Sequence, residues 1–542
     1  MTPGTLRHGQ ALTRLKGRNG ASPYRFTVGP PPVHLKEDMI QRLFALTIVT
    51  VWLAACGGPG PSNGVMPQSP ADTSMSPSKV NPPFPEPPDV LPVHHVATVS
   101  LTAKVNPANE LPAFVYNGQT GVAPTIRVKP GDTIVIDVLN SLPGPGRLGD
   151  LNLHFHGLGV SPNPPADDVI TTLALPGGSL HYVVPIPKNQ EPGLYWYHPH
   201  VFPNTNFQVG DSGMSGAIVV EGLERHLPGL AKMKERLMMV RDIGTGDSDS
   251  RRALPHGISN VPCGPDPGLT VTVNGAVRPV IPIAPGEQQF FRVVNATGHK
   301  NLKLAVDGGT LQIVAIDGFA LDSYPGTGPT ETVPSVVVPP AARAEFVVTG
   351  PAGTGAKFRT LCYNSGPGGD PDPQAVLAVL QAPQSGPDRR AVGSHRLRAG
   401  APLPNNAYSF PLPAPVGQRT VTLSEDDKRM YINGKSFKMM DPPMFVVNVG
   451  TTEKWQIVNV TQEVHDFHIH QTHFVVKEID GVKVAHPYWA DSVVVPHEKN
   501  GTPGTVTLLM DFRDPVIRGT FMFHCHILDH EDSGMMAKIQ AI

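Results

Sequence analysis

The chain has almost no excess of charge of either sign. Its 542 residues include 43 Lys and Arg against 45 Asp and Glu, a formal net charge of −2. This balance offers no electrostatic attraction to nucleic acid, so we expect no nucleic-acid partner. Long amphipathic helical patterns are also scarce, and short runs rich in Val, Ile and Thr lie between turns supplied by 55 Gly and 61 Pro. These features predict an all-β protein of two to four domains.

The hydrophobic run near the N-terminus is too short to cross a bilayer comfortably. This run, "LFALTIVTVWLAA" at 43–55, follows Arg42 and ends in "LAAC". It resembles a bacterial lipoprotein signal over residues 1–56, with Cys56 as the lipidated first mature residue; an ordinary secretory signal is the alternative. A start at Met39 would give this signal an ordinary length. We therefore expect an exported lipoprotein, anchored at Cys56 to a membrane of the cell envelope and facing the periplasm or the cell surface.

Proline is concentrated after this signal. Residues 57–92 contain eleven prolines, interspersed with Ser, Gly and Asn. Such a composition does not bury an apolar core, so we expect a disordered or extended tether over residues 57–93. The tether would space a folded body from the membrane anchor.

Cysteine is scarce, with four in the chain. Lipid would occupy Cys56, and Cys525 lies in a metal-binding pattern described below. An oxidising cell envelope permits Cys263 and Cys362 to form a disulfide, and two buried free thiols are the alternative.

A pattern of strand, turn and strand occurs three times, as "IRVKPGDTIVIDVLN" (126–140), "IPIAPGEQQFFRVVN" (281–295) and "FVVNVGTTEKWQIVN" (445–459). Each unit follows an Asn-Gly pair and has alternating apolar residues around a glycine, which predicts a β-hairpin. The spacing between units is that of one β-sandwich domain. We therefore expect three domains, at 94–222, 223–390 and 391–542. In each unit a glycine stands nine residues before an asparagine: Gly131 and Asn140, Gly286 and Asn295, Gly450 and Asn459.

Histidine pairs of the form His-x-His are over-represented. With 22 histidines in 542 residues, chance gives about one such pair. The chain has four: His154 and His156, His198 and His200, His468 and His470, His524 and His526. In a strand, the two rings of each pair point to the same face.

The stretch "HCHILDHEDSGMM" (524–536) combines one such pair with a thiol. If "FMFHCHI" is a strand, Cys525 faces away from its two neighbouring histidines. Cys525, His530 and Met535 then supply three ligands of a blue-copper centre, which needs one more imidazole. His465 fits, because its odd spacing from His468 turns it away from the His468 pair.

The first and third domains correspond. "GLYWYHPH" (193–200) parallels "GTFMFHCH" (519–526), so Pro199 stands where Cys525 stands, and Leu151 falls where His465 falls. The second domain has no His-x-His in its matching stretch and is interpreted as a spacer. The eight paired imidazoles exceed the needs of one metal ion and suit a three-copper cluster shared by the outer domains.

These motifs resemble those of the three-domain bacterial multicopper oxidases, the laccase and cuprous oxidase group, over roughly residues 94–542. The resemblance implies three cupredoxin-like Greek-key β-sandwiches and four copper ions. Type 1 copper would be held by His465, Cys525, His530 and Met535. Type 2 copper would be held by His154 and His468. The type 3 pair would be held by His156, His198, His200, His470, His524 and His526.

The resemblance also implies a reaction, in which four one-electron oxidations of a reductant are coupled to reduction of dioxygen to two waters. The reductant would be a phenol, a cuprous ion or another metal ion; copper detoxification and non-catalytic copper binding are the alternative functions. Protons would come from Glu531 and Asp167, with Asp168 as the less favoured neighbour. We expect a monomer.

Three features depart from the family pattern or have no role in it. Asp466 stands where many relatives have proline, and His473 has no role in the family. Core packing is the interpretation for the loose methionine cluster, with a cuprous-ion entry site as the alternative; its members are Met430, Met439, Met440 and Met444.

Overall fold

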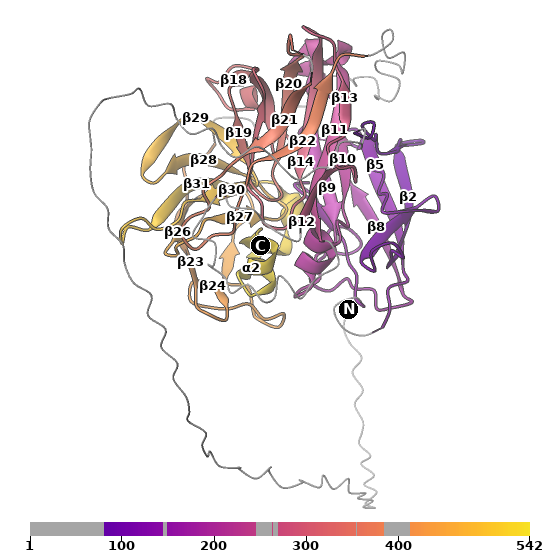
Figure 1. Cartoon of the computed structure of the whole chain (residues 1–542). Helices are drawn as coiled ribbons and strands as arrows, with labels where there is room; N and C mark the ends of the chain where they lie inside the picture. Colours follow the sequence, from indigo (N-terminus) through magenta and orange to yellow (C-terminus); the bar gives the residue numbers. More distant parts are fainter. Residues whose placement is uncertain (1–80, 145–148, 245–262, 264–268, 354, 384–411) are drawn as a thin grey trace, which may run out of the picture. The chain divides into compact units, whose positions relative to one another are not determined.

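The computed structural model describes residues 81–144, 149–244, 263, 269–353, 355–383 and 412–542. The predicted signal segment with Cys56 and most of the predicted tether lie outside these residues. The described part is all-β, as predicted, and its six sheets form three sandwiches in chain order (Figure 1). Within it, no helix has the length and apolarity to cross a membrane.

The first sandwich joins two five-stranded sheets around one apolar core. The burial of β2 alternates residue by residue, as expected for a strand with one face toward the core. One sheet has the order β1 (Asp89–Val90), β5 (Thr125–Val128), β10 (Gly216–Val220), β9 (Gly193–His198), β7 (His154–His156). The other has the order β4 (Gln119–Thr120), β3 (Pro112–Tyr116), β2 (Val96–Val105), β6 (Thr133–Asn140), β8 (Ser179–Pro185).

The second sandwich has a core of its own. Its larger sheet has the order β12 (Leu269–Val273), β11 (Lys234–Gly244), β14 (Gln288–Asn295), β20 (Arg343–Thr349), β16 (Leu311–Ile316), β17 (Phe319–Ala320), with β18 (Glu331–Val333) also beside β16. Its smaller sheet has the order β13 (Val280–Pro282), β22 (Ala375–Gln381), β21 (Ala356–Leu361), β15 (Leu302–Val306), β19 (Val336–Val338).

The third sandwich contains the cysteine-bearing strand β32. One sheet has the order β24 (Met430–Ile432), β23 (Gly417–Glu425), β26 (Thr451–Asn459), β31 (Gly504–Phe512), β28 (Phe474–Ile479), β29 (Val482–Ala490). The other has the order β25 (Phe445–Val447), β33 (Met536–Ala541), β32 (Gly519–Cys525), β27 (His465–Ile469), β30 (Ser492–Val495).

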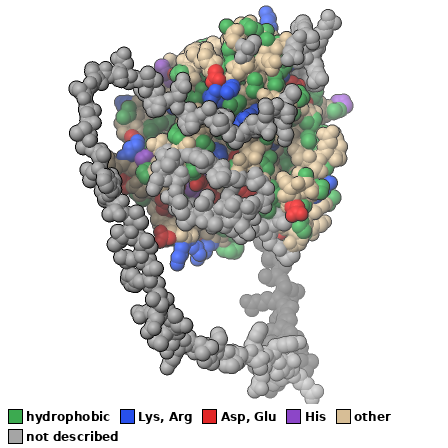
Figure 2. Space-filling model, viewed as in Figure 1, with side chains coloured by type: hydrophobic (Ala, Val, Ile, Leu, Met, Phe, Trp, Pro, Cys, Tyr) green, Lys and Arg blue, Asp and Glu red, His purple; other side chains and the backbone are tan. Residues whose placement is uncertain are grey.

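Helices are short in the described part. One α-helix, α2 (Leu528–Asp532), follows β32. The remaining turns are η1 (Asn206–Asp211), η2 (Leu223–Arg225), η3 (Pro228–Lys232), η4 (Leu321–Ser323) and η5 (Pro515–Ile517). On the face shown in Figure 2, basic and acidic side chains are interspersed among hydrophobic ones, in keeping with the small net charge.

The three repeated units are not hairpins, and that prediction was wrong. In the first unit, β5 and β6 belong to different sheets, and the turn at Gly131 (φ +92°) carries the chain from one sheet to the other. The other two units make the same crossing, from β13 to β14 and from β25 to β26. Alternating apolar residues around a glycine turn suit a hairpin and a crossing between sheets equally, because both put one face of each strand in the core.

The asparagine that ends each unit has the same buried role. Asn140 donates through Nδ2 to the carbonyls of Gly149 and Ala174, at 2.8 and 2.9 Å. Asn295 and Asn459 make corresponding pairs of bonds. One bond of each goes to the loop after its own strand, at Lys300 and Glu463, and the other goes to the end of another strand, at Val338 in β19 and Val495 in β30. The repeat in the sequence thus reflects an amide that fastens a loop to the core.

The predicted tether ends earlier than residue 93. β1 lies within it and pairs in parallel with β5, Asp89 beside Thr125. The Phe84 amide donates to the Val280 carbonyl of the second sandwich at 3.1 Å. The tether prediction was wrong for residues 83–90, because proline-rich sequence also suits the extended edge of a sheet.

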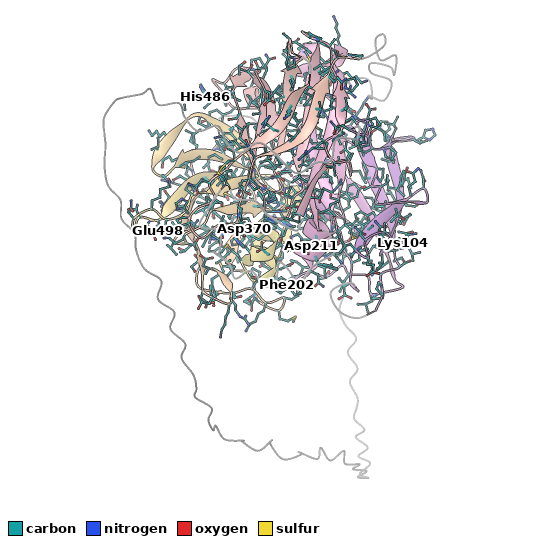
Figure 3. All side chains as sticks on the ribbon, in the orientation of Figure 1. Lys104, Phe202, Asp211, Asp370, His486 and Glu498 are labelled. Carbon is teal, nitrogen blue, oxygen red and sulfur yellow. A yellow bond between two sulfur atoms is a disulfide. The ribbon has the colours of Figure 1, made fainter. Side chains whose placement is uncertain are left out.

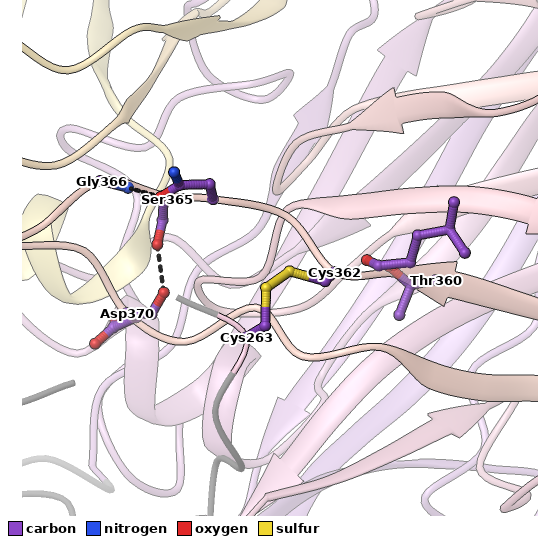
Figure 4. The surroundings of a disulfide bond; sticks show 8 residues. Cys263, Thr360, Cys362, Ser365, Gly366 and Asp370 are labelled. Atoms are coloured by element: carbon purple, nitrogen blue, oxygen red, sulfur yellow. Dashed lines mark hydrogen bonds between the residues drawn. A yellow bond between two sulfur atoms is a disulfide. The ribbon is translucent and has the colours of Figure 1, made fainter. Parts of the chain in front are cut away.

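A disulfide joins Cys263 to Cys362 in the second sandwich, which confirms the pairing that the sequence left open (Figure 4). The Cα atoms are 5.4 Å apart and the half-cystines are 99 residues apart in the chain. Among the described residues, Cys525 is the free cysteine, and it is buried.

Candidate metal centre

The strand β32 divides its side chains between two sites, as its alternation predicted. Cys525 points into the core of the third sandwich, where its Sγ lies 3.7 Å from Nδ1 of His465 and 3.7 Å from Nδ1 of His530. His524 points the other way, and its Nε2 lies 3.3 Å from Nε2 of His200 in the first sandwich.

The cysteine site has the donors of a copper centre. The two Nδ1 atoms of His465 and His530 are 3.1 Å apart, and all three side chains are buried. Met535 is fully buried in the same core, and its carbonyl accepts the Cys525 amide at 3.0 Å. A thiolate, two imidazoles and a thioether are the ligand set of a blue-copper site.

Groups behind the two imidazoles fix which nitrogen faces the cysteine. Nε2 of His465 lies 3.0 Å from the Thr461 hydroxyl, and Nε2 of His530 lies 3.3 Å from Oε1 of Glu463. Both rings therefore present Nδ1 to Cys525. Such outer contacts set ring orientation at metal sites.

Burial raises the pKa of the Cys525 thiol well above its ordinary value. A buried thiol ionises when a cation compensates the charge, so metal binding at this site would release a proton. The burial of Cys525 is thus in keeping with a metal ligand.

The eight paired histidines converge between the first and third sandwiches, and each is buried. Nε2 of His524 lies 3.3 Å from that of His200 and 3.2 Å from that of His470, so three donors meet at one point. His156, His198 and His526 form a second group, with ring centroids 5.1 to 5.8 Å apart. His154 and His468, one from each sandwich, have ring centroids 6.0 Å apart.

Several of these rings have one nitrogen in a hydrogen bond and the other without a hydrogen-bond partner. Nδ1 of His154 lies 3.0 Å from Asp167, and Nδ1 of His198 lies 2.9 Å from the Pro199 carbonyl. The opposite nitrogen of each is buried without a hydrogen-bond partner. Buried polar atoms normally have partners, so this set of unpaired nitrogens fits bound metal ions.

Burial keeps these imidazoles neutral. It lowers the pKa of His200 to about 3 and that of His468 to about 4. Burial, reinforced by neighbouring histidines, lowers the pKa of His154 and His524 well below the ordinary value. Neutral imidazole is the metal-binding form of histidine, so the cluster is ready to coordinate at neutral pH.

The two expected proton donors both lie beside the cluster. Asp167 contacts His154 as described, whereas Asp168 accepts hydrogen bonds from the Ile170 and Thr171 amides. Glu531 in α2 is buried, and its Oε2 lies 3.2 Å from Nδ1 of His524. Burial raises the pKa of Asp167 to about 7 and that of Glu531 well above its ordinary value.

Three residues near the site were given no role from the sequence. Asp491, in "YWADSVVV", accepts from Nε2 of His156 at 3.2 Å. His473 is buried, with its Nε2 3.5 Å from Asp491. Arg343, in "AARAEF", reaches Asp491 from the second sandwich. A charged residue in a largely apolar stretch was the one signal in the sequence for Asp491 and Arg343.

The exceptional Asp466 is buried, and its amide donates to Cys525 Sγ at 3.4 Å. A proline at this position would have no N–H to donate. Of the methionine cluster, Met430 is buried and Met440 is 92% exposed, so core packing accounts for part of the cluster only.

Comparisons with known proteins point to one family. Sequence models described as multicopper oxidase match residues 99–225, 240–384 and 410–541. A multicopper oxidase of Staphylococcus aureus is 26% identical over 443 residues, covering 78% of this chain and 83% of the relative. A laccase of Bacillus subtilis is 26% identical over 475 residues, covering 78% and 88%.

Solved structures share the fold. A multicopper oxidase from Campylobacter jejuni, described as a metallo-oxidase, aligns with a TM-score of 0.63 at 23% identity, covering 86% of this chain and 99% of that one. A laccase-like CueO from Ochrobactrum sp. aligns with a TM-score of 0.62 at 22% identity, covering 85% and 100%. Together with the family matches and the histidine-rich centre, these likenesses show that the chain belongs to the multicopper oxidases, copper-dependent oxidoreductases that use dioxygen.

Proposed function

We propose that the chain holds four copper ions and couples one-electron oxidation of a small reductant to four-electron reduction of dioxygen to water. The division of β32 between two sites carries this proposal, because the Cys525 site and the histidine cluster are joined through one peptide unit. Copper bound there would supply the one-electron chemistry. The ligands would be those implied by the family: His465, Cys525, His530 and Met535 for type 1, His154 and His468 for type 2, and His156, His198, His200, His470, His524 and His526 for type 3.

Copper content and oxygen uptake test this proposal together. The purified chain loaded with copper should be blue, contain about four coppers, and consume oxygen with a reductant. A chain that binds copper without consuming oxygen with any of the phenols, cuprous, ferrous or manganous ions would be a copper-storage protein instead.

The reductant would deliver electrons near His530, whose outer nitrogen contacts Glu463. The pKa of Glu463 is raised well above its ordinary value, mainly by burial and then by the neighbouring carboxyl groups of Glu425, Asp370 and Asp529. These carboxyl groups therefore lie near enough to Glu463 to interact with it electrostatically (Asp370 is labelled in Figure 3). Clustered carboxyl groups favour a cation, which supports cuprous ion or another metal ion as reductant. Among the structural relatives, one is described as a metallo-oxidase and another as oxidising lignin model compounds, so phenols are the second candidate.

Glu425→Gln distinguishes a metal-ion reductant from a phenol. Glu425 is replaced instead of Glu463, because Glu463 also orients His530. If a metal ion is the substrate, the variant should raise KM for that ion several-fold and leave KM for a phenol unchanged. Glu331→Gln, on the exposed edge strand β18, is the matched control. Equal effects on ion and phenol would argue against docking of a cation at these carboxyl groups.

We also propose that Glu531 and Asp167 supply protons for dioxygen reduction. Oε1 of Glu531 accepts from the Thr205 hydroxyl at 2.8 Å, which holds the carboxyl beside the cluster. Glu531→Gln keeps the shape and removes the proton, so reoxidation by dioxygen should slow by about 10²-fold or more while reduction by substrate is unchanged. Unchanged reoxidation in stopped-flow would move the proton route to Asp167.

For location, we propose export and lipid anchoring at Cys56. The Cys263–Cys362 disulfide supports an oxidising compartment. Native protein should fractionate with membranes, and Cys56→Ser should release it; a soluble wild type with an unmodified N-terminus would contradict the anchor. A monomer is proposed, to be tested by light scattering of the solubilised chain.

A further inference from the structure

A buried arginine of the second sandwich reaches the junction of all three sandwiches. Arg343 begins β20 and is fully buried. Its Nε donates to the Leu194 carbonyl of the first sandwich at 3.0 Å. Its Nη1 and Nη2 donate to Oδ1 and Oδ2 of Asp491 in the third sandwich, at 2.7 and 2.6 Å. This two-pronged contact matches the planar guanidinium and is not reproduced by lysine.

Asp491 in turn contacts two imidazoles of the cluster. Its Oδ1 accepts from Nε2 of His156 at 3.2 Å, and its carbonyl accepts from Nδ1 of His468 at 2.8 Å. Because the proton of His156 is held on Nε2, its Nδ1 faces the cluster, buried and without a hydrogen-bond partner. Nε2 of His468 faces the cluster in the same unpaired state. His154 and His198 instead present Nε2, so Asp491 sets a different donor atom on His156.

The surroundings hold this contact in one geometry. Asp317 accepts the Arg343 amide at 2.7 Å and the Asp491 amide at 3.2 Å, which fixes both backbones. A Cβ on Gly157, which has φ +84°, would overlap Nη2 of Arg343, so the residue after His156 leaves room for the guanidinium.

We propose that Arg343 is a positioning residue of the histidine cluster. Through Asp491 it fixes the proton of His156 on Nε2 and orients the stacked rings of His156 and His468, whose centroids are 3.9 Å apart. The second sandwich is therefore more than a spacer, since it supplies the guanidinium that positions two of the proposed copper-binding histidines. This inference rests on the proposed ligand roles of His156 and His468.

The test compares Arg343→Lys with Arg292→Lys in the full-length chain. Arg292 is also buried in the second sandwich and pairs with Glu345 at 3.1 Å, so it is a matched control for replacing a buried, ion-paired guanidinium by lysine. Each protein is loaded with copper and titrated with chelators of graded affinity. Copper per chain, the blue absorbance of the cysteine site and the electron paramagnetic resonance signal of type 2 copper are recorded.

Arg343→Lys should keep the blue absorbance, while the affinity of the cluster for copper falls about 10- to 100-fold and the type 2 signal changes. Arg292→Lys should lower the melting temperature and leave both cluster measurements at wild-type values. If Arg343→Lys does not fold, Asp491→Asn serves, because it keeps the shape and removes the charge; it should show the same loss.

Equal cluster affinity and an equal type 2 signal in wild type and Arg343→Lys would overturn the inference alone. An equal loss of copper affinity in Arg292→Lys would also overturn the inference, because the effect would then reflect general destabilisation. A wild-type chain that binds no copper would overturn the proposed function, and this inference with it.

Discussion

Replacing Cys525 by serine separates the two sites that share β32. With copper bound, its Sγ would be the thiolate that completes the His465 and His530 pair; it lies 3.7 Å from each Nδ1. Without a thiolate, two neutral imidazoles and a weak thioether remain, so one of four coppers should be lost. The fold should survive, because the new hydroxyl can accept the Asp466 amide that now donates to Sγ at 3.4 Å, and a buried hydroxyl with a partner costs about 1–2 kcal/mol.

The assay is absorption spectroscopy with copper counting on the loaded protein. Cys525→Ser should lose the blue band and keep about three coppers, since His524 and His526 point away from the cysteine core. Ala537→Ser is the matched control, because Ala537 is buried in the same core opposite Phe523; it should keep the colour and all four coppers. Loss of cluster copper together with the blue band would refute the division of the strand between two sites.

Three further perturbations follow from the geometry. Replacing both Cys263 and Cys362 by alanine should lower the free energy of unfolding by up to about 4–5 kcal/mol, given the 99-residue separation; an unchanged urea midpoint would contradict this. Burial, and then Asp322, raises the pKa of Glu191 from 4.5 to about 8. Between these pH values the folded chain holds a proton that the unfolded chain has lost. The free energy of unfolding should therefore fall by up to roughly 4–5 kcal/mol as the pH rises from 4.5 to about 8. Glu191→Gln should remove this pH dependence of the melting temperature. Asp466→Pro should lower the type 1 reduction potential, because it removes an N–H donor to sulfur worth about 1 kcal/mol, on the order of 40 mV for one electron; Asp466→Asn, which keeps the N–H, should retain more of the potential in redox titration.

The sequence predicted the parts of the site that depend on alternation along a strand. The opposite directions of Cys525 and His524 follow from their neighbouring positions in one strand, and the turn of His465 away from His468 follows from odd spacing. Both are properties of the local chain, so no knowledge of tertiary contacts was needed. The choice of Asp167 over Asp168, in contrast, depends on how a loop folds back, which spacing left loose.

Contacts between sheets and between domains could not be predicted from the sequence. The turn at Gly131 joins two sheets instead of two paired strands, because hydrogen-bond partners are chosen in three dimensions while periodicity reports only burial. The segment around Phe84 packs on the second sandwich despite its prolines. Arg343 was missed for the same reason, since it lies about 150 residues from Asp491 and carries no motif of its own.

Copper counting on the wild-type chain tests the central claim most directly. Purified protein, loaded with copper and dialysed, should be blue and contain about four coppers per chain. The Cys525→Ser variant should lose one of these coppers and retain three. A colourless chain that carries four coppers would contradict the assignment of Cys525 as a ligand, and a chain that binds no more than one copper would contradict the shared histidine cluster.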